Sequence, residues 1–395
     1  MFIVLAILAF GVIIAVHELG HFIAAKIMGV KVNEFAIGMG PKILSKQGKE
    51  TVYSLRLFPF GGFCAMDDDD VSVGEGTNNL AKKDSEDETS NSGNEQNFIS
   101  DDIYGSDGDT EDNTPNPRSF TAQKRWRRVV ILAAGSFANF IMALIIIFIL
   151  TSGATNFTGT TLTNVVDNMP ELGPSELLPG DRLLYINNER LFYHDDFALF
   201  ININSIAGNP IIITLERDGE RIEFERRPHF VDGVEQFRYG IAFNEIEANT
   251  WERIRYSFYQ TYSFIRMIRV SISMMISGAA TVRDVAGPVG IVDAMNTMGQ
   301  QAPTVAAGIG NIVFFTAFIG VNIAVVNLMP IPAMDGGRIL FIILTWIIEK
   351  VTRRKLDPKY EAYINTGAFV LLIGLMVLVL YNDIARLIDG GGILG

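Results

Sequence analysis

The chain has 395 residues, 49% of them hydrophobic, and its mean hydropathy is +0.26, which is high for a soluble protein. Its net charge of −12 is local, because residues 67–112 hold sixteen acidic side chains and two lysines, so the charge implies no basic ligand for the whole protein. The single cysteine, Cys64, excludes an intramolecular disulfide, and the length allows two or more domains.

Four apolar runs approach or exceed the roughly 20 residues that cross a bilayer. They are residues 1–28, 129–150, 305–329 and 367–380 with their apolar flanks. These runs predict an α-helical integral membrane protein with four transmembrane helices. We expect the first run to be a retained span, because it lacks the basic start and the small-residue cleavage site of a signal peptide.

The first run contains the pattern His17-Glu18-Leu19-Gly20-His21. Histidines four positions apart share one face of a helix, roughly 6 Å apart along its axis, so both imidazoles can reach one zinc ion. Glu18 would then lie close enough to activate a water molecule on the metal. Ionisable groups inside a span indicate function. The alternative is a helix end whose polar side chains face lipid headgroups.

The next two segments differ in composition. Residues 35–66 hold short strand-like runs separated by Gly and Pro, which predict a membrane-associated β region over residues 29–66. Such a sheet could offer an edge to an extended peptide, or it could be a plain hairpin lid. Residues 67–117 are too polar to bury a core and predict a disordered acidic linker. A docking tail for a basic partner is the alternative.

Residues 155–232 predict a small α/β domain. The expected strands are 161–166, 182–186, 210–217 and 220–226, with a helix over 197–203 and tight turns at 187–188 and 218–219. The segment that follows, 253–278, is apolar but carries four arginines. We interpret it as an amphipathic helix at the outer surface, not as a fifth span.

Lysines and arginines gather after the first run, before the second, and between the third and fourth. By the positive-inside rule, residues 29–128 and the 337–360 loop or helix are cytoplasmic. Both termini and residues 152–303 then lie outside.

Asp335 is the best candidate for a third zinc ligand, since a catalytic zinc usually has three protein ligands. It follows Pro330 and Pro332, which end the third run and free backbone groups that a membrane tolerates only inside protein or beside a polar cavity. His17 lies roughly 24 Å along a helix that enters from outside. Asp335 reaches the same depth only if the third run also enters from outside, which argues against a fifth span. The alternative is a helix stop with a solvated carboxylate.

Four motifs together resemble the site-2 protease family of intramembrane zinc proteases. They are residues 17–21, the Gly135-Ser136-Phe137-Ala138-Asn139 segment, Gly287-Pro288-Val289-Gly290-Ile291, and residues 327–337. The resemblance is to the bacterial branch with a single PDZ domain, similar to the proteases that regulate sigma-E. It covers nearly the whole chain except residues 67–117.

The resemblance implies that His17, His21 and Asp335 bind Zn²⁺ and that Glu18 is the catalytic acid/base. It further implies substrate-binding roles for other residues. Asn327 would contact the substrate backbone beside the metal. Gly61 and Gly62 would belong to a β-loop that pairs with the unfolding substrate helix, and Asn139 matches an asparagine of the second-span motif.

The implied function is an intramembrane endopeptidase of the inner (plasma) membrane. It would cut single-span regulators, such as anti-sigma factors, or signal-peptide remnants, and no nucleic acid is expected as a partner. The domain boundaries that we expect are 1–28, 29–66, 67–117, 118–151, 155–232 (PDZ), 233–302, 303–336, 337–360 and 361–395. A membrane-anchored PDZ binding module with an inactive metal site is the alternative, and a transporter is weakened by the lack of repeated spans.

Overall fold

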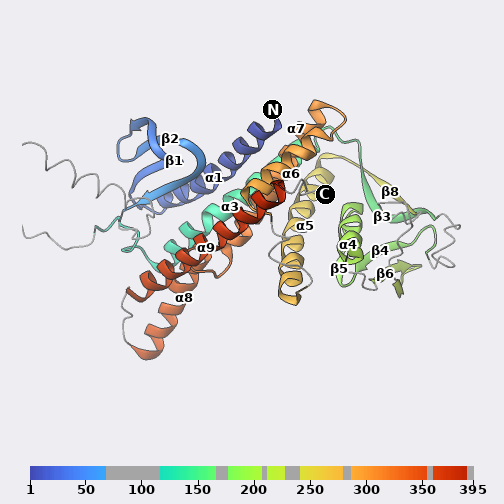
Figure 1. Ribbon diagram of the computed structural model, residues 1–395. Helices are drawn as coiled ribbons and strands as arrows, with labels where there is room; N and C mark the ends of the chain where they lie inside the picture. Colours follow the sequence, from blue (N-terminus) through green and yellow to red (C-terminus); the bar gives the residue numbers. More distant parts are fainter. Residues whose placement is uncertain are drawn as a thin grey trace, which may run out of the picture. The chain divides into compact units, whose positions relative to one another are not determined.

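The computed structural model describes residues 1–67, 116–165, 177–206, 211–226, 241–278, 286–353 and 359–388 (Figure 1). The disordered linker predicted at 67–117 therefore falls almost wholly outside the described residues. The fold is mostly helical, with some antiparallel sheet.

Four of the described helices are long and apolar enough to cross a membrane, which confirms the prediction of four spans. They are α1 (Phe2–Ile27), α3 (Arg125–Leu150), α7 (Val305–Leu328) and α9 (Lys359–Ile388). The chain divides into two compact units. One comprises Met1–Ala9, Asn139–Asn327 and Gly367–Gly395, and the other comprises Phe10–Ala138 and Leu328–Thr366.

The unit that begins at Phe10 contains a sheet made by β1 (Val32–Gln47) and β2 (Val52–Met66). Both strands bend, so that residues 34–37 pair with 52–55 on one side and with 62–65 on the other. Gly38 lies at the bend of β1 with a φ of +87°, which glycine adopts without steric cost. The glycines thus bend long strands, where the sequence predicts short separate ones.

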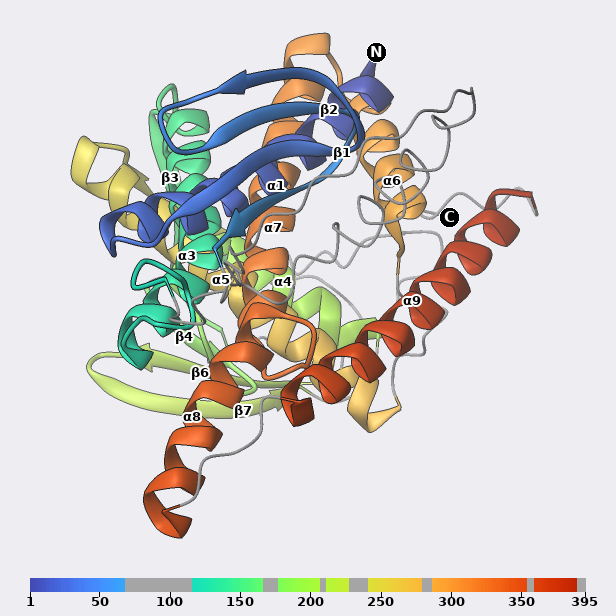
Figure 2. The ribbon, with the colours of Figure 1, turned by 90° about the vertical axis from the view of Figure 1, so that its left-hand side faces the viewer.

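Figure 2 shows this sheet beside α1. The two pack through the ring of Phe22, whose centroid lies 5.2 Å from that of Phe35 and 5.9 Å from that of Tyr53. Helix α8 (Asp335–Thr352) belongs to the same unit and occupies much of the predicted 337–360 segment. Buried apolar side chains join these elements into one core: Ala24, Ala25, Val30, Val32, Met66, Phe120, Ile131, Leu132 and Ile342.

The other unit contains an antiparallel sheet with strand order β7-β6-β4-β3-β8, and β5 pairs with β4. Its elements are β3 (Asn156–Val165), β4 (Arg182–Ile186), β5 (Glu189–Arg190), α4 (His194–Ile206), β6 (Ile211–Arg217), β7 (Glu220–Arg226) and β8 (Ile241–Glu247). Asn187 and Asn188 both have positive φ, as do Asp218 and Gly219. Positive φ at both central residues suits tight hairpin turns, and both pairs lie where the sequence predicts turns.

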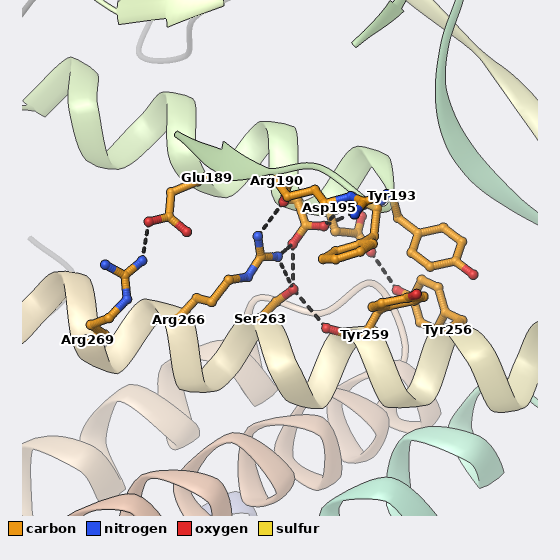
Figure 3. A network of polar contacts seen from close by, with 11 residues as sticks. Glu189, Arg190, Tyr193, Asp195, Tyr256, Tyr259, Ser263, Arg266 and Arg269 are labelled. Carbon is orange, nitrogen blue, oxygen red and sulfur yellow. Dashed lines mark hydrogen bonds and ion pairs between the residues drawn. The ribbon is translucent and has the colours of Figure 1, made fainter. Parts of the chain in front are cut away.

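Helix α5 (Thr250–Ser277) begins where the Asn249 side chain accepts a hydrogen bond from the backbone N–H of Glu252. It is not one of the four candidate spans. One side carries Ser263, Arg266 and Arg269, which reach the β5–α4 segment (Figure 3). Another side contributes Phe264 and Ile268 to an apolar core with α3 and α7.

The shorter helix α6 (Pro288–Gln300) starts at the Gly-Pro-Val-Gly motif, and Gly287 is its N-cap. The Asp383 carboxylate of α9 accepts hydrogen bonds from the backbone N–H groups of Gly287, at 3.1 Å, and Gly290, at 2.9 Å. A Cβ on Gly287 would come within 2.6 Å of that carboxylate. The glycine therefore permits the close approach of α9.

Candidate metal centre

His17 and His21 lie one turn apart on α1, and both side chains are buried. Their Nε2 atoms are 3.1 Å apart, and the rings meet edge to face with centroids at 4.7 Å. Two imidazole nitrogens at this separation converge on a single point, as ligands of one ion do.

Asp335 reaches the same point from the first residue of α8. Its Oδ2 lies 3.2 Å from Nε2 of His17 and 3.3 Å from Nε2 of His21. The turn before it is tight. Ala333 has a φ of +70°, and a Cβ on Gly336 would lie 2.2 Å from the Met329 carbonyl oxygen. The Gly336-Gly337 pair therefore lets α8 start at the aspartate.

The three side chains fit a zinc ion. Their ligand atoms all lie within 4.8 Å of one another, and no other group of this kind is found among the described residues. Two histidines and one carboxylate match the ligand set of catalytic zinc sites, which keep a further position open for water or substrate.

His21 has a fixed orientation, since its Nδ1 lies 2.8 Å from the Ile131 carbonyl oxygen of α3. A carbonyl can only accept, so Nδ1 carries the proton and Nε2 keeps its lone pair for a metal.

Gly135 of α3 gives the imidazoles their space. A Cβ at this position would lie 2.3 Å from Nε2 of His21 and 2.8 Å from Cε1 of His17. Gly20 does the same between the helices, because its Cβ would lie 2.4 Å from the Ala134 carbonyl oxygen. The sequence placed Gly135 in a family motif without giving it a role at the metal, and it did not point to the Ile131 carbonyl. A glycine inside an apolar span is the signal that could have indicated the close approach.

Glu18 follows His17 on α1, is half-buried, and lies against β2. A Cβ on Gly62 would be 3.3 Å from Cγ of Glu18. The 62–65 segment is an edge of its sheet, with no strand on its outer side among the described residues. The structure thus brings Glu18 and Gly62 together.

Three further residues were predicted to bind substrate: Gly61, Asn327 and Asn139. Gly61 precedes Gly62 in β2 with a φ of +87°. Asn327 is half-buried next to the last residue of α7. Asn139 is fully buried in α3, and neither atom of its amide group has a hydrogen-bond partner among the described residues. Both asparagines belong to the compact unit that does not contain the histidines.

Known proteins resemble this chain over nearly its whole length. Residues 5–375 match the model of "Peptidase family M50". The chain is 34% identical over 388 residues to a Clostridium perfringens protein with the provisional name zinc metalloprotease, covering 97% of this chain and 98% of that protein. It is 30% identical over 428 residues to the zinc metalloprotease RasP of Bacillus licheniformis, covering 96% and 98%. The chain therefore belongs to peptidase family M50, the site-2 protease family that its sequence resembles.

Proposed function

We propose that this zinc metalloprotease cleaves peptide bonds within or near the transmembrane segments of other membrane proteins. The observation that carries the proposal is the convergence of His17, His21 and Asp335, two of them in the second half of an apolar helix. We assign these three residues as the zinc ligands. The alternative of a binding module with an inactive site is not favoured, because the ligand set is complete.

Glu18 is proposed as the general acid and base. A zinc ion at this site would supply Lewis acidity, which acidifies water and polarises a peptide carbonyl. The Glu18 carboxylate takes a proton from the attacking water and returns it to the leaving amine. Nδ1–H of His21 keeps its hydrogen bond to Ile131 throughout, so the imidazole does not rotate away.

The substrate has to unwind before it can react, because the amides of a transmembrane helix are hidden in hydrogen bonds. The open edge at residues 62–65 lies beside Glu18 and could hold the extended segment by strand pairing. We assign Gly61 and Gly62, at the start of this edge, to that strand pairing, because a side chain on Gly62 would press on Glu18. We infer that the Asn327 amide binds a substrate backbone group and that Asn139, whose buried amide lacks a partner, is a second such contact.

We further propose that β3–β8 with α4 form a PDZ domain outside the inner (plasma) membrane. Its tight turns, single helix and antiparallel sheet support the first part. The distribution of Lys and Arg supports the orientation, with both termini outside. Substrates of this class are single-span regulators and signal-peptide remnants.

Metal analysis and cleavage assays on the detergent-solubilised full chain test the proposal. Wild type should contain one zinc ion, while His21→Ala and Asp335→Ala should lose it. Glu18→Gln should keep zinc but no longer cut a model single-span substrate. His194→Ala is the matched control, because His194 lies in α4 of the other unit. Normal cleavage by Glu18→Gln, or full zinc in Asp335→Ala, would overturn the assignment.

A further inference from the structure

A cleft of about 700 Å³ lies between the start of α3 and one side of α8. It belongs to the unit that holds the metal ligands, but none of its lining residues is a ligand. Lys124, Arg125, Trp126 and Arg128 line it from the α3 side, and Ile342 and Trp346 line it from α8. One cavity thus combines cationic, aromatic and aliphatic side chains.

The charge of the cleft is positive. Residues 116–150 contain five Lys or Arg and no Asp or Glu. Arg125 forms an ion pair with Glu349 of α8, whereas Lys124 is exposed and takes part in no ion pair among the described residues. The Arg128 guanidinium lies over the Phe120 ring at 5.0 Å, which orients it. Lys124 therefore gives the cleft a positive charge that Glu349 does not neutralise.

The aromatic residues mark the depth of the cleft in a membrane. Trp126 and Trp346 are 55% and 46% exposed, and they are two of the three tryptophans in the chain. Helix α3 is a candidate span that begins at Arg125. Tryptophans concentrate at membrane–water interfaces, so the cleft lies at the level of lipid headgroups.

The surface next to the cleft is apolar. Ile343 of α8 lines the cleft and is 43% exposed, and Ile347, one turn further along the same side of α8, is 44% exposed. A ligand that fits would carry a negative charge at one end and hydrocarbon at the other. This surface also distinguishes a lipid from a free anion, which would leave the apolar side chains uncovered.

We propose that the cleft binds an anionic phospholipid, with Lys124 and Arg128 around the headgroup phosphate and Trp126, Ile342 and Trp346 against the upper acyl chains. Basic pockets between membrane helices are known to select anionic headgroups. The site lies outside the proposed substrate path, so the proposal does not depend on the proposed function.

Tryptophan quenching tests this directly, because the Trp251→Phe variant leaves only Trp126 and Trp346 to fluoresce. The full chain is reconstituted in phosphatidylcholine bilayers, and acyl-brominated phosphatidylglycerol or phosphatidylcholine is added at equal mole fraction. We expect the anionic lipid to quench with an apparent association constant about fivefold or more higher. In the Lys124→Gln/Arg128→Gln double variant the ratio of the two association constants should fall close to one. High salt should lower the same ratio in wild type.

Two controls keep the outcome clear. Lys46→Gln/Lys49→Gln removes the same charge near the turn between β1 and β2 and should keep the preference. Lys124→Arg/Arg128→Lys keeps the charge and should also keep it, even if the glutamine pair fails to fold. The proposal would be overturned if both lipids quenched wild type equally. It would also be overturned if the preference for the anionic lipid survived in the folded Lys124→Gln and Lys124→Gln/Arg128→Gln variants. A preference seen only after deletion of residues 68–115 would also overturn it, since the acidic segment would then be the occupant.

Discussion

Arg266 of α5 forms an ion pair with Asp196 of α4, and the two side chains are only 5% and 4% exposed. Ser263 Oγ donates to the same carboxylate at 2.5 Å, and the backbone N–H of Phe192 donates at 2.8 Å. The guanidinium also lies over the rings of Phe192, Phe200 and Tyr262. The pair fastens α5 to the β5–α4 segment, while the Phe264 side of the helix packs with α3 and α7.

Removal of one partner of this pair should strongly destabilise the sheet of β3–β8 with its helix α4. Arg266→Met leaves the Asp196 charge buried without its partner, and we expect a loss of about 3–5 kcal/mol. The Asp196→Leu/Arg266→Met double variant should lose less than the sum of the single changes. Hydrogen exchange of peptides from residues 177–226 measures these losses. Arg269→Met is the control, because Arg269 is 63% exposed and its pair with Glu189 should contribute about 1 kcal/mol or less. Additive single effects would contradict the coupling.

The same domain should lose stability in acid through Asp181, which is 1% exposed. Burial alone would raise its pKa, but two hydrogen bonds from Arg217, at 2.7 and 2.8 Å, and one from the Leu178 N–H hold the pKa below its usual value. Because the pKa of Asp181 is lower in the folded chain, its ionised carboxylate stabilises the fold at any pH above the unfolded pKa of about 4. This stabilisation is lost as the pH falls through the folded pKa.

The measurement is the hydrogen exchange of the domain between pH 6 and pH 3, corrected for intrinsic rates. Asp181→Asn should be less stable than wild type at pH 6, with a smaller further loss in acid. An acid dependence equal to that of wild type would assign the loss to other carboxylates.

Gly135→Ala should remove zinc without changing any ligand. The new methyl group would lie 2.3 Å from Nε2 of His21, so the imidazole must leave its position. We expect the zinc content of the purified chain to fall by most of its value. Gly310→Ala in α7 is the matched control, because nothing lies within 4 Å of its added Cβ. Full zinc occupancy in Gly135→Ala would show that α1 and α3 can separate at no cost.

Asp383 should stabilise the junction between α9 and α6. Asp383→Leu leaves two buried backbone N–H groups without an acceptor, at a cost of about 1–3 kcal/mol each. Asp383→Asn keeps one acceptor oxygen and should cost less. The thermal midpoint in detergent distinguishes them, with Tyr381→Phe as a control because Tyr381 is 71% exposed. A midpoint for Asp383→Leu equal to that of Asp383→Asn would contradict the role of the carboxylate.

The sequence was sufficient for the spans because hydropathy over 20 residues is a local property. The same holds for the Asn187-Asn188 and Asp218-Gly219 turns, where positive φ selects the residue types. His17 and His21 lie on one helix, so their proximity follows from helical spacing alone. Asp335 is more than 300 residues away, and three arguments pointed to it: the two prolines before it, the depth of the spans and the family resemblance.

Other features depend on contacts that no local pattern contains. The pairing of residues 34–37 with two segments of β2 arises from bends at glycines that also suit loops. Ile131 acts through its backbone carbonyl oxygen, and Gly135 acts through the absence of a Cβ. In neither case does a side chain indicate the role in the sequence. The capping of α6 by Asp383 joins positions almost 100 residues apart.

An inhibitor could bind at two neighbouring places, the open edge at residues 62–65 and the histidines of the proposed zinc site. An extended peptidomimetic could form backbone hydrogen bonds along this edge, beside Glu18, while a chelating group such as a hydroxamate reaches the histidines. Chelation alone would be shared by unrelated zinc peptidases. Strand complementarity would add the discrimination, because a competitor enzyme without such an edge leaves those amides unpaired.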